Sequence, residues 1–93
     1  MTSRDAIALT CYGEARGESL EGRAAVAWVL KNRLTSGRWG HTYEAVATAP
    51  HQFSCWNVGD PNRDVLLKKL EAVQSGAVPQ DAALNECYWI ADG

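Results

Sequence analysis

Apolar residues recur along this chain at the three- and four-residue spacing of an α-helix, and glycines end the pattern. Gly17, Gly37 and Gly76 each follow such an apolar stripe. The spacing predicts five helices, over residues of about 4–16, 20–36, 43–49, 61–75 and from 81 onward. Gln52–Trp56 is aromatic and compact, so we expect a short strand or an extended loop there. The predicted fold class is mainly α (α+β), with at most a small β element in the middle.

Residues that favour helix starts precede three of these segments. Ser19 and Thr42 are good N-caps, because their hydroxyls can accept hydrogen bonds from the first backbone N–H groups of a helix. Asp60 precedes Pro61, and proline suits the first helical position because its missing N–H would have no partner there. The local sequence therefore supports the predicted boundaries.

The length and composition of the chain suit one globular domain. Of its 93 residues, 46% are apolar and 22% are charged. Nine basic and eleven acidic residues give a net charge of −2, and no basic run is longer than Lys68-Lys69, so we do not expect a nucleic-acid partner. No apolar run approaches the roughly 18–20 residues that cross a membrane, so no membrane span is expected.

The cysteines and histidines do not form a metal-binding pattern. Cys11, Cys55 and Cys87 are widely spaced and include no CxxC pair, and His41 and His51 are not at ligand spacing to them. We therefore expect no metal and no cofactor. One disulfide with a free thiol, or three free thiols, both fit the sequence.

The segment from Tyr12 to Glu18 carries the residues most suited to chemistry. Glu14 lies two turns after Ile7, so we expect it to share the face that packs inward and to be partly removed from water. It also lies in the last predicted turn, where the helix dipole disfavours negative charge. Both effects favour a protonated carboxyl, which glycoside cleavage needs to protonate the departing oxygen. From spacing alone, an exposed surface glutamate is the commoner case.

Three separated motifs occur in order along the chain. They are EARGE at 14–18, GRAAVAWVLKNR at 22–33 and QFS at 52–54. Together they resemble the cell wall hydrolase family that includes the spore-cortex-lytic enzymes, over about residues 8–56. The resemblance implies a lysozyme-like fold and cleavage of the peptidoglycan glycan strand between N-acetylmuramic acid and N-acetylglucosamine. It also implies that Glu14 is the catalyst.

Other motif residues are candidates for binding or support. Glu18 is either a second carboxylate for the reaction or a loop acid near the next helix N-terminus. Arg16 is a surface cation or a partner of Glu18 or Glu21, and Tyr12 faces the groove or covers it. The predicted substrate-binding residues are Tyr12, Glu18, Gln52, Phe53 and Ser54, and the predicted supporting residues are Arg16, Asn32 and Arg33. We expect Asn32 and Arg33 to brace the EARGE loop rather than to act in catalysis.

A single catalytic acid suits a lytic transglycosylase, in which the C6 hydroxyl of the muramic acid attacks its own anomeric carbon. Peptidoglycan strands are thus the expected partner, and a hydrolytic muramidase is the alternative reaction. A non-catalytic peptidoglycan-binding module of the same fold is the second hypothesis. A helical protein-interaction domain is the third, and it predicts a large exposed apolar face and no polar cleft around Glu14. An amidase ranks last, since that chemistry needs a metal or an activated nucleophile.

The ends of the chain carry two further expectations. Members of this family usually continue to a segment resembling GATHY, which the sequence does not reach. We therefore expect residues 1–93 to form a single catalytic domain that is truncated at its C-terminus. The N-terminus lacks the basic start and apolar run of a signal peptide. The expected place of action is the cell wall or periplasm, by a delivery route that the sequence does not specify.

Overall fold

A computed structural model describes residues 1–76 and 81–93 of the chain. Its elements, in chain order, are α1 (Ser3–Ala15), α2 (Leu20–Ser36), α3 (Tyr43–Thr48), the short 3-10 helix η1 (Ser54–Trp56), α4 (Pro61–Gln74) and α5 (Ala82–Asp92). No strand occurs among the residues described. The predicted mainly α class is confirmed, and each predicted helix is found.

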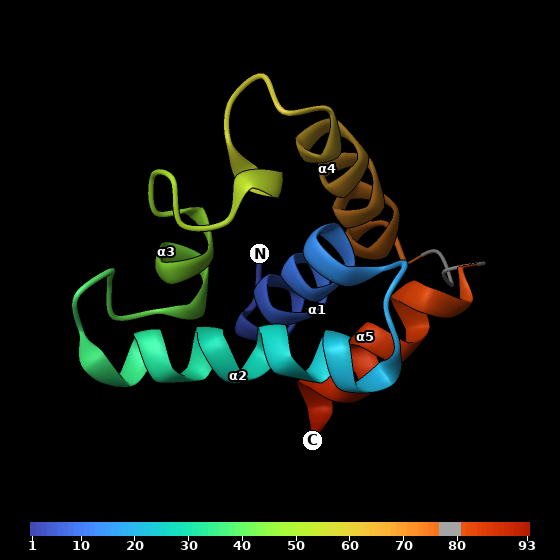
Figure 1. Cartoon of the computed structure of the whole chain (residues 1–93). Helices are drawn as coiled ribbons and strands as arrows, with labels where there is room; N and C mark the ends of the chain where they lie inside the picture. Colours follow the sequence, from blue (N-terminus) through green and yellow to red (C-terminus); the bar gives the residue numbers. More distant parts are fainter. Residues whose placement is uncertain (77–80) are drawn as a thin grey trace.

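Helix α1 lies at the centre of the molecule (Figure 1). It contacts all four of the other α-helices and η1, with the most extensive contacts to α5 and α2. Helix α2 passes along one side of α1, while α4 and the loop that carries η1 lie on the other side (Figure 1). Because neighbours surround α1, most of its circumference belongs to the core.

The caps explain why the helices begin where they do. Ser19 and Thr42 accept hydrogen bonds from backbone N–H groups at the starts of α2 and α3, as predicted. Asp60 caps α4 ahead of Pro61, also as predicted. Helix α1 starts with a capping box, in which the Thr2 and Asp5 side chains bond to each other's backbone N–H groups. These local bonds supply partners that the first turn of a helix otherwise lacks.

The segment Gln52–Trp56 differs from the expected strand or extended loop. Residues Ser54–Trp56 form η1, and Phe53 directly before it has extended backbone angles. The aromatic character of the segment reflects burial rather than sheet formation, because Phe53, Cys55 and Trp56 all belong to the core. The expectation of a strand was therefore wrong.

Two buried polar bonds join α1 to distant parts of the chain. The indole Nε1 of Trp56 donates to the hydroxyl of Thr10 over 2.9 Å, which fastens η1 to α1. The hydroxyl of Tyr88 in α5 donates to the Asp5 carboxylate over 2.8 Å. Each bond satisfies polar groups that would be costly to bury alone. In the described part of the chain, no helix is both long and apolar enough to cross a membrane.

Candidate active site

An open pocket of about 480 Å³ brings the first and third sequence motifs together. Its volume lies within the range of about 300–1,000 Å³ that is usual for ligand sites. Its lining consists of Glu14 from α1, an apolar strip from α2, three loop residues and the first residue of η1: Glu14, Ala25, Val26, Val29, His51, Gln52, Phe53 and Ser54. A carboxylate, an amide and a hydroxyl thus face the same pocket as three aliphatic side chains.

Glu14 occupies the last turn of α1, as predicted, but its side chain is exposed. The expectation that Glu14 is partly removed from water is therefore wrong for the free protein. The reason is the packing of α1, which is buried almost all the way round. Thr10 and Cys11, one turn earlier on the same side of α1, are fully buried, whereas Glu14 lies in the last turn, beyond that cover. This exposure leaves the carboxylate open to a ligand in the pocket.

The Glu14 carboxylate contacts the loop across the pocket wall. The backbone N–H of Cys55 points to Glu14 Oε1 at a nitrogen–oxygen distance of 3.5 Å. That distance is long for a hydrogen bond, although such contacts often tighten once a ligand is bound. The contact places the carboxylate beside the start of η1.

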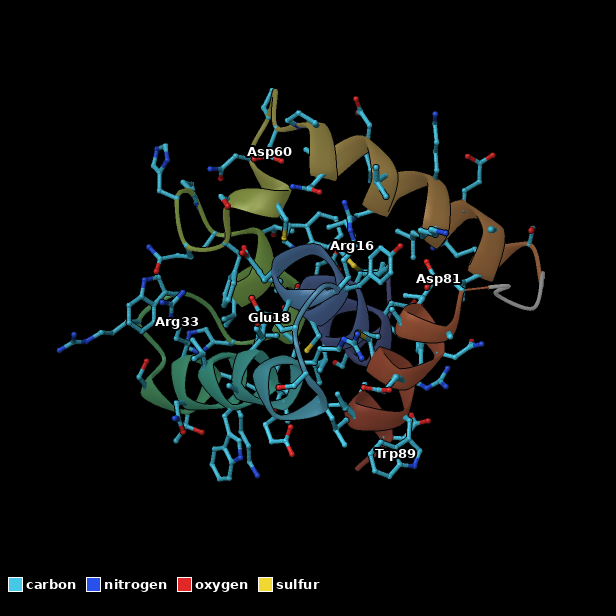
Figure 2. All side chains as sticks on the ribbon, turned by 45° about the vertical axis from the view of Figure 1, so that its right-hand side comes forward. Arg16, Glu18, Arg33, Asp60, Asp81 and Trp89 are labelled. Atoms are coloured by element: carbon cyan, nitrogen blue, oxygen red, sulfur yellow. The ribbon has the colours of Figure 1, made fainter. Side chains whose placement is uncertain are left out.

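The residues of the QFS motif are held in place by Arg33. Its Nη1 donates to the main-chain carbonyl of Gln52 over 3.3 Å, and its guanidinium lies over the Phe53 ring at 4.8 Å from the centroid. Figure 2 shows Arg33 on the side of the molecule where α2 faces this loop. These contacts join Arg33 to Gln52 and Phe53, not to the EARGE segment that we expected it to brace. Asn32, its neighbour, is exposed on α2.

Tyr12 does not line the pocket with Glu14. Its side chain is buried, and its hydroxyl donates to the Asp81 carboxylate over 2.5 Å. Burial and this hydrogen bond both raise the pKa of Tyr12. The expectation that Tyr12 faces or covers the groove is not met, because Tyr12 lies about half a helical turn from Glu14 and points toward α4 and the start of α5 instead. Arg16 stacks over the Tyr12 ring and donates to Asn62 of α4 over 3.1 Å, so its contacts are not to Glu18 or Glu21.

Glu18 projects from the connection between α1 and α2 (Figure 2). It is exposed, and its Cβ lies so close to Gly22 that a side chain at position 22 would come within 2.8 Å of it. Glu18 is absent from the pocket lining, all of which belongs to the described residues. The loop position beside the N-terminus of α2 is therefore the one observed, and Glu14 is the only carboxylate among the lining residues.

Two residues at or behind this site, His51 and Arg23, were not predicted from the sequence. His51 lines the pocket and has a φ of 63°, an uncommon angle for a residue other than glycine. Arg23 donates to the Arg16 carbonyl over 2.8 Å and also pairs with Glu86 of α5, so it fixes the end of α1. Arg23 lies inside the second motif and His51 directly before the third. Their nearness to these motifs is the sequence feature that could have identified them as site residues.

A second concavity, of about 520 Å³, lies between the start of α2 and the end of α5. It is mainly apolar, and Trp89 on its rim is 67% exposed (Figure 2). Its two carboxylates are Glu21 and Asp92, and Asp92 is paired with Arg4. We place the candidate chemistry at the Glu14 pocket, because the motif residues meet there. The hypothesis of a protein-interaction domain predicts an exposed apolar face, and this concavity provides one. It also predicts that no polar cleft surrounds Glu14, and the pocket beside Glu14 contradicts that prediction.

The described residues contain no group of three or more His, Cys, Asp or Glu side chains that could hold a metal ion. Cys11, Cys55 and Cys87 are all buried and unpaired as disulfides. Burial raises the pKa of Cys11 to about 12 and that of Cys87 to about 11, so both remain protonated near neutral pH.

Comparisons with known proteins identify the family. The cell wall hydrolase family model matches residues 17–91, which begins just after Glu14. A spore cortex-lytic enzyme of Oceanobacillus iheyensis is 37% identical over 78 residues, covering 84% of this chain and 28% of the relative. A spore cortex-lytic enzyme of Bacillus subtilis is 35% identical over 82 residues, covering 84% of this chain and 27% of the relative. The chain thus spans little more than a quarter of the length of these curated relatives, and no solved structure matches it significantly. The match to the family model covers most of the chain, and the chain belongs to the cell wall hydrolase family.

Proposed function

We propose that this domain cleaves the glycan strand of peptidoglycan between N-acetylmuramic acid and N-acetylglucosamine, with Glu14 as its general acid and base. The observation that carries the proposal is that Glu14 lines an open pocket together with Gln52, Phe53 and Ser54, in a chain of the cell wall hydrolase family. If so, the domain acts at the cell wall or in the periplasm.

The pocket supplies complementary surfaces for a sugar. The Gln52 amide and the Ser54 hydroxyl can bond to N-acetyl and hydroxyl groups, while Ala25 and Val29 form an apolar strip on the facing helix. A bound strand would displace water from Glu14, and a drier site favours the protonated carboxyl that the first step requires.

The reaction that we favour is that of a lytic transglycosylase. Glu14 first donates its proton to the glycosidic oxygen as the bond to the anomeric carbon breaks. The C6 hydroxyl of the same muramic acid then attacks that carbon, and its proton passes to the Glu14 carboxylate. The product is a 1,6-anhydro sugar, and no second carboxylate is needed. The presence of one carboxylate in the pocket lining supports this choice over a two-carboxylate hydrolysis.

Muropeptide release from purified sacculi tests the proposal. Glu14→Gln keeps the size of the side chain and removes its acid function, so release should fall about a hundredfold or more. Glu21→Gln is the matched control, since Glu21 is an exposed acid in the first turn of α2 and outside this pocket. If the wild type and Glu14→Gln both release nothing, the enzymatic proposal fails. Binding of the chain to insoluble peptidoglycan would then identify it as a glycan-binding module.

Mass spectrometry of the products separates the two reactions. A transglycosylase product is lighter by one water than the hydrolytic product. If the hydrolytic product appears, and Glu18→Gln reduces release as strongly as Glu14→Gln, a two-carboxylate muramidase replaces the proposed mechanism.

A further inference from the structure

The turn that carries His51 has a backbone angle that glycine would adopt more easily. The Gln52 N–H donates to the Ala49 carbonyl over 3.2 Å and closes a four-residue turn. Pro50 is its second residue, and His51 is its third, with a φ of 63°. A turn with proline second and a positive φ third usually has glycine or asparagine there, because a Cβ atom crowds the backbone at that angle. The chain thus keeps a side chain at a position where glycine would cost less.

This side chain lines the Glu14 pocket and does not hold the fold together. His51 is among the lining residues of the pocket, and it is exposed. The part of the chain that the structure describes gives its imidazole neither a hydrogen bond nor an ionic partner. A residue that keeps an unfavourable φ without stabilising contacts of its own indicates a role in function rather than in folding.

His51 gives the pocket a hydrogen-bond donor of a kind that the other lining residues lack. Among these residues, its side chain alone can carry a positive charge, and that of Glu14 alone a negative one. An imidazole donates a hydrogen bond in its neutral form as well as in its charged form. The next residue, Gln52, is held through its carbonyl by Arg33 of α2 over 3.3 Å. The donor is therefore carried on a turn that is tied to the facing helix.

The two sugars of the proposed substrate differ in one group that such a donor can recognise. N-acetylmuramic acid carries a lactyl ether at C3, which N-acetylglucosamine lacks. The carboxyl group of this ether is either free or joined to a peptide by an amide bond, and its oxygen accepts a hydrogen bond in both cases. A carboxylate would be repelled by ionised Glu14 and attracted by His51. Recognition of this group would decide which of the alternating sugars lies beside Glu14.

We propose that His51 is a specificity-determining residue, whose imidazole donates a hydrogen bond to the lactyl carboxyl group of N-acetylmuramic acid. The inference rests on the proposed function and deepens it, because it says how the Glu14 pocket selects its sugar. When C1 of the muramic acid lies at Glu14, its C3 substituent lies on the other side of the sugar ring. The pocket, of about 480 Å³, has room for both contacts.

Binding of two disaccharides, followed by NMR chemical-shift titration of the full chain, tests the inference without any need for activity. One probe is N-acetylglucosaminyl-N-acetylmuramic acid, whose internal bond is not the one that we propose is cleaved. The other consists of two N-acetylglucosamine residues and lacks the lactyl group. His51→Gly should weaken binding of the muramic disaccharide about tenfold and change that of the other by less than about twofold. His51→Asn tolerates the turn and keeps a donor, so it should lose less.

The melting temperature of His51→Gly separates a lost contact from lost stability. Relief of the backbone angle should leave it equal to that of the wild type or higher by up to about 5 °C. His41→Ala is the control, since His41 is exposed and outside the pocket lining, and it should bind both disaccharides as the wild type does. Equal affinities of wild type and His51→Gly for the muramic disaccharide would overturn the inference, and so would equal losses for both probes.

A muropeptide that bears its peptide is the third probe. His51→Gly should weaken its binding as much as that of the muramic disaccharide, because both contain the lactyl group. A loss confined to the muropeptide would assign the contact to the peptide and overturn the lactyl assignment.

Cleavage of solubilised glycan strands separates this inference from the proposed function. In an active wild type, His51→Gly should raise KM about tenfold with little change in kcat. If the wild type cleaves and His51→Gly has the same KM, the proposed function stands and the inference fails. If the wild type does not cleave, but His51→Gly selectively loses the muramic disaccharide, the catalytic proposal fails and His51 remains the residue that recognises muramic acid.

Discussion

The guanidinium of Arg33 in α2 donates a 3.3 Å hydrogen bond to the main-chain carbonyl of Gln52, in the opposite wall of the Glu14 pocket. The same group lies 4.8 Å from the centroid of the Phe53 ring and 5.2 Å from that of Trp39. One side chain therefore connects the helix that supplies the apolar strip to the loop that supplies the polar groups.

Arg33→Lys should weaken this connection while it keeps the charge. Lysine has no planar group to lie between two rings, and it cannot reproduce the fixed direction of the guanidinium N–H groups. We expect a loss of about 1 kcal/mol in the free energy of unfolding, or a melting temperature about 4–8 °C lower. Muropeptide release should fall further than this destabilisation alone explains. Arg38→Lys, at an exposed position just after α2, is the control. Equal rates and melting temperatures for wild type and Arg33→Lys would refute the bracing role.

Gly13→Ala should destabilise the protein, although alanine is the better helix former by about 1 kcal/mol. The added Cβ would lie 2.8 Å from Cys55 and 2.9 Å from Leu66, so η1 or α4 must shift. Overpacking of this kind costs about 1–3 kcal/mol. Gly17→Ala is the control, because no atom lies within 4 Å of a Cβ there. Urea denaturation of both variants measures the difference, and a Gly13→Ala protein as stable as Gly17→Ala would contradict the prediction.

Thr10→Val should show how much the hydrogen bond between Trp56 of η1 and Thr10 of α1 contributes to the stability of the fold. The change keeps the shape of the side chain but removes the acceptor of the buried Trp56 indole N–H. An unpaired buried donor costs about 1–3 kcal/mol, and we expect a loss of stability of that size. Thr10→Ser keeps the hydroxyl and should recover the part of the loss that is due to the bond. Chemical denaturation followed by tryptophan fluorescence compares the two, and equal losses would show that packing alone matters.

Acid should destabilise the fold through Asp5 and Asp81. Burial tends to raise the pKa of Asp5, but hydrogen bonds from Thr2 and Tyr88 outweigh it, and the pKa is lowered. The hydrogen bond from Tyr12 is the main cause that lowers the pKa of Asp81. A carboxyl with a lowered folded-state pKa stabilises the fold above its unfolded pKa of about 4, and this contribution is lost as pH falls through the folded value. We therefore expect the melting temperature to decline below about pH 4.

Tyr12→Phe tests the Asp81 part of this dependence. Without the hydroxyl, the pKa of Asp81 returns toward its ordinary value and the variant loses less stability on acidification. The difference in melting temperature between wild type and Tyr12→Phe should thus be larger at pH 7 than at pH 3. Circular dichroism melts across this range measure it. A difference that stays constant with pH would assign the effect of Tyr12 to packing rather than to its bond with Asp81.

The helices of this protein were predictable because their signals are local. A cap such as Ser19 or Asp60 acts within three residues, and an apolar stripe is read within a few turns. The ordered motifs also led to the correct family and to the grouping of Glu14 with Gln52–Ser54 in one pocket. Each of these conclusions needed only residues that are close in sequence or a pattern already present along the chain.

The surroundings of Glu14 were decided by the tertiary structure alone. The sequence by itself determined that Glu14 lies near the end of a helix, but the segments that pack around α1 determine that Thr10 and Cys11 are buried while Glu14 is exposed. That packing exposes Glu14, turns Tyr12 away toward Asp81 and brings Cys55 against Gly13. Periodicity identifies the faces of a helix without telling which partner covers each face, because the partners come from segments far along the chain. Glu14 and Cys55, 41 residues apart, come into contact because Cys55 packs against Gly13, which has no side chain to keep it away.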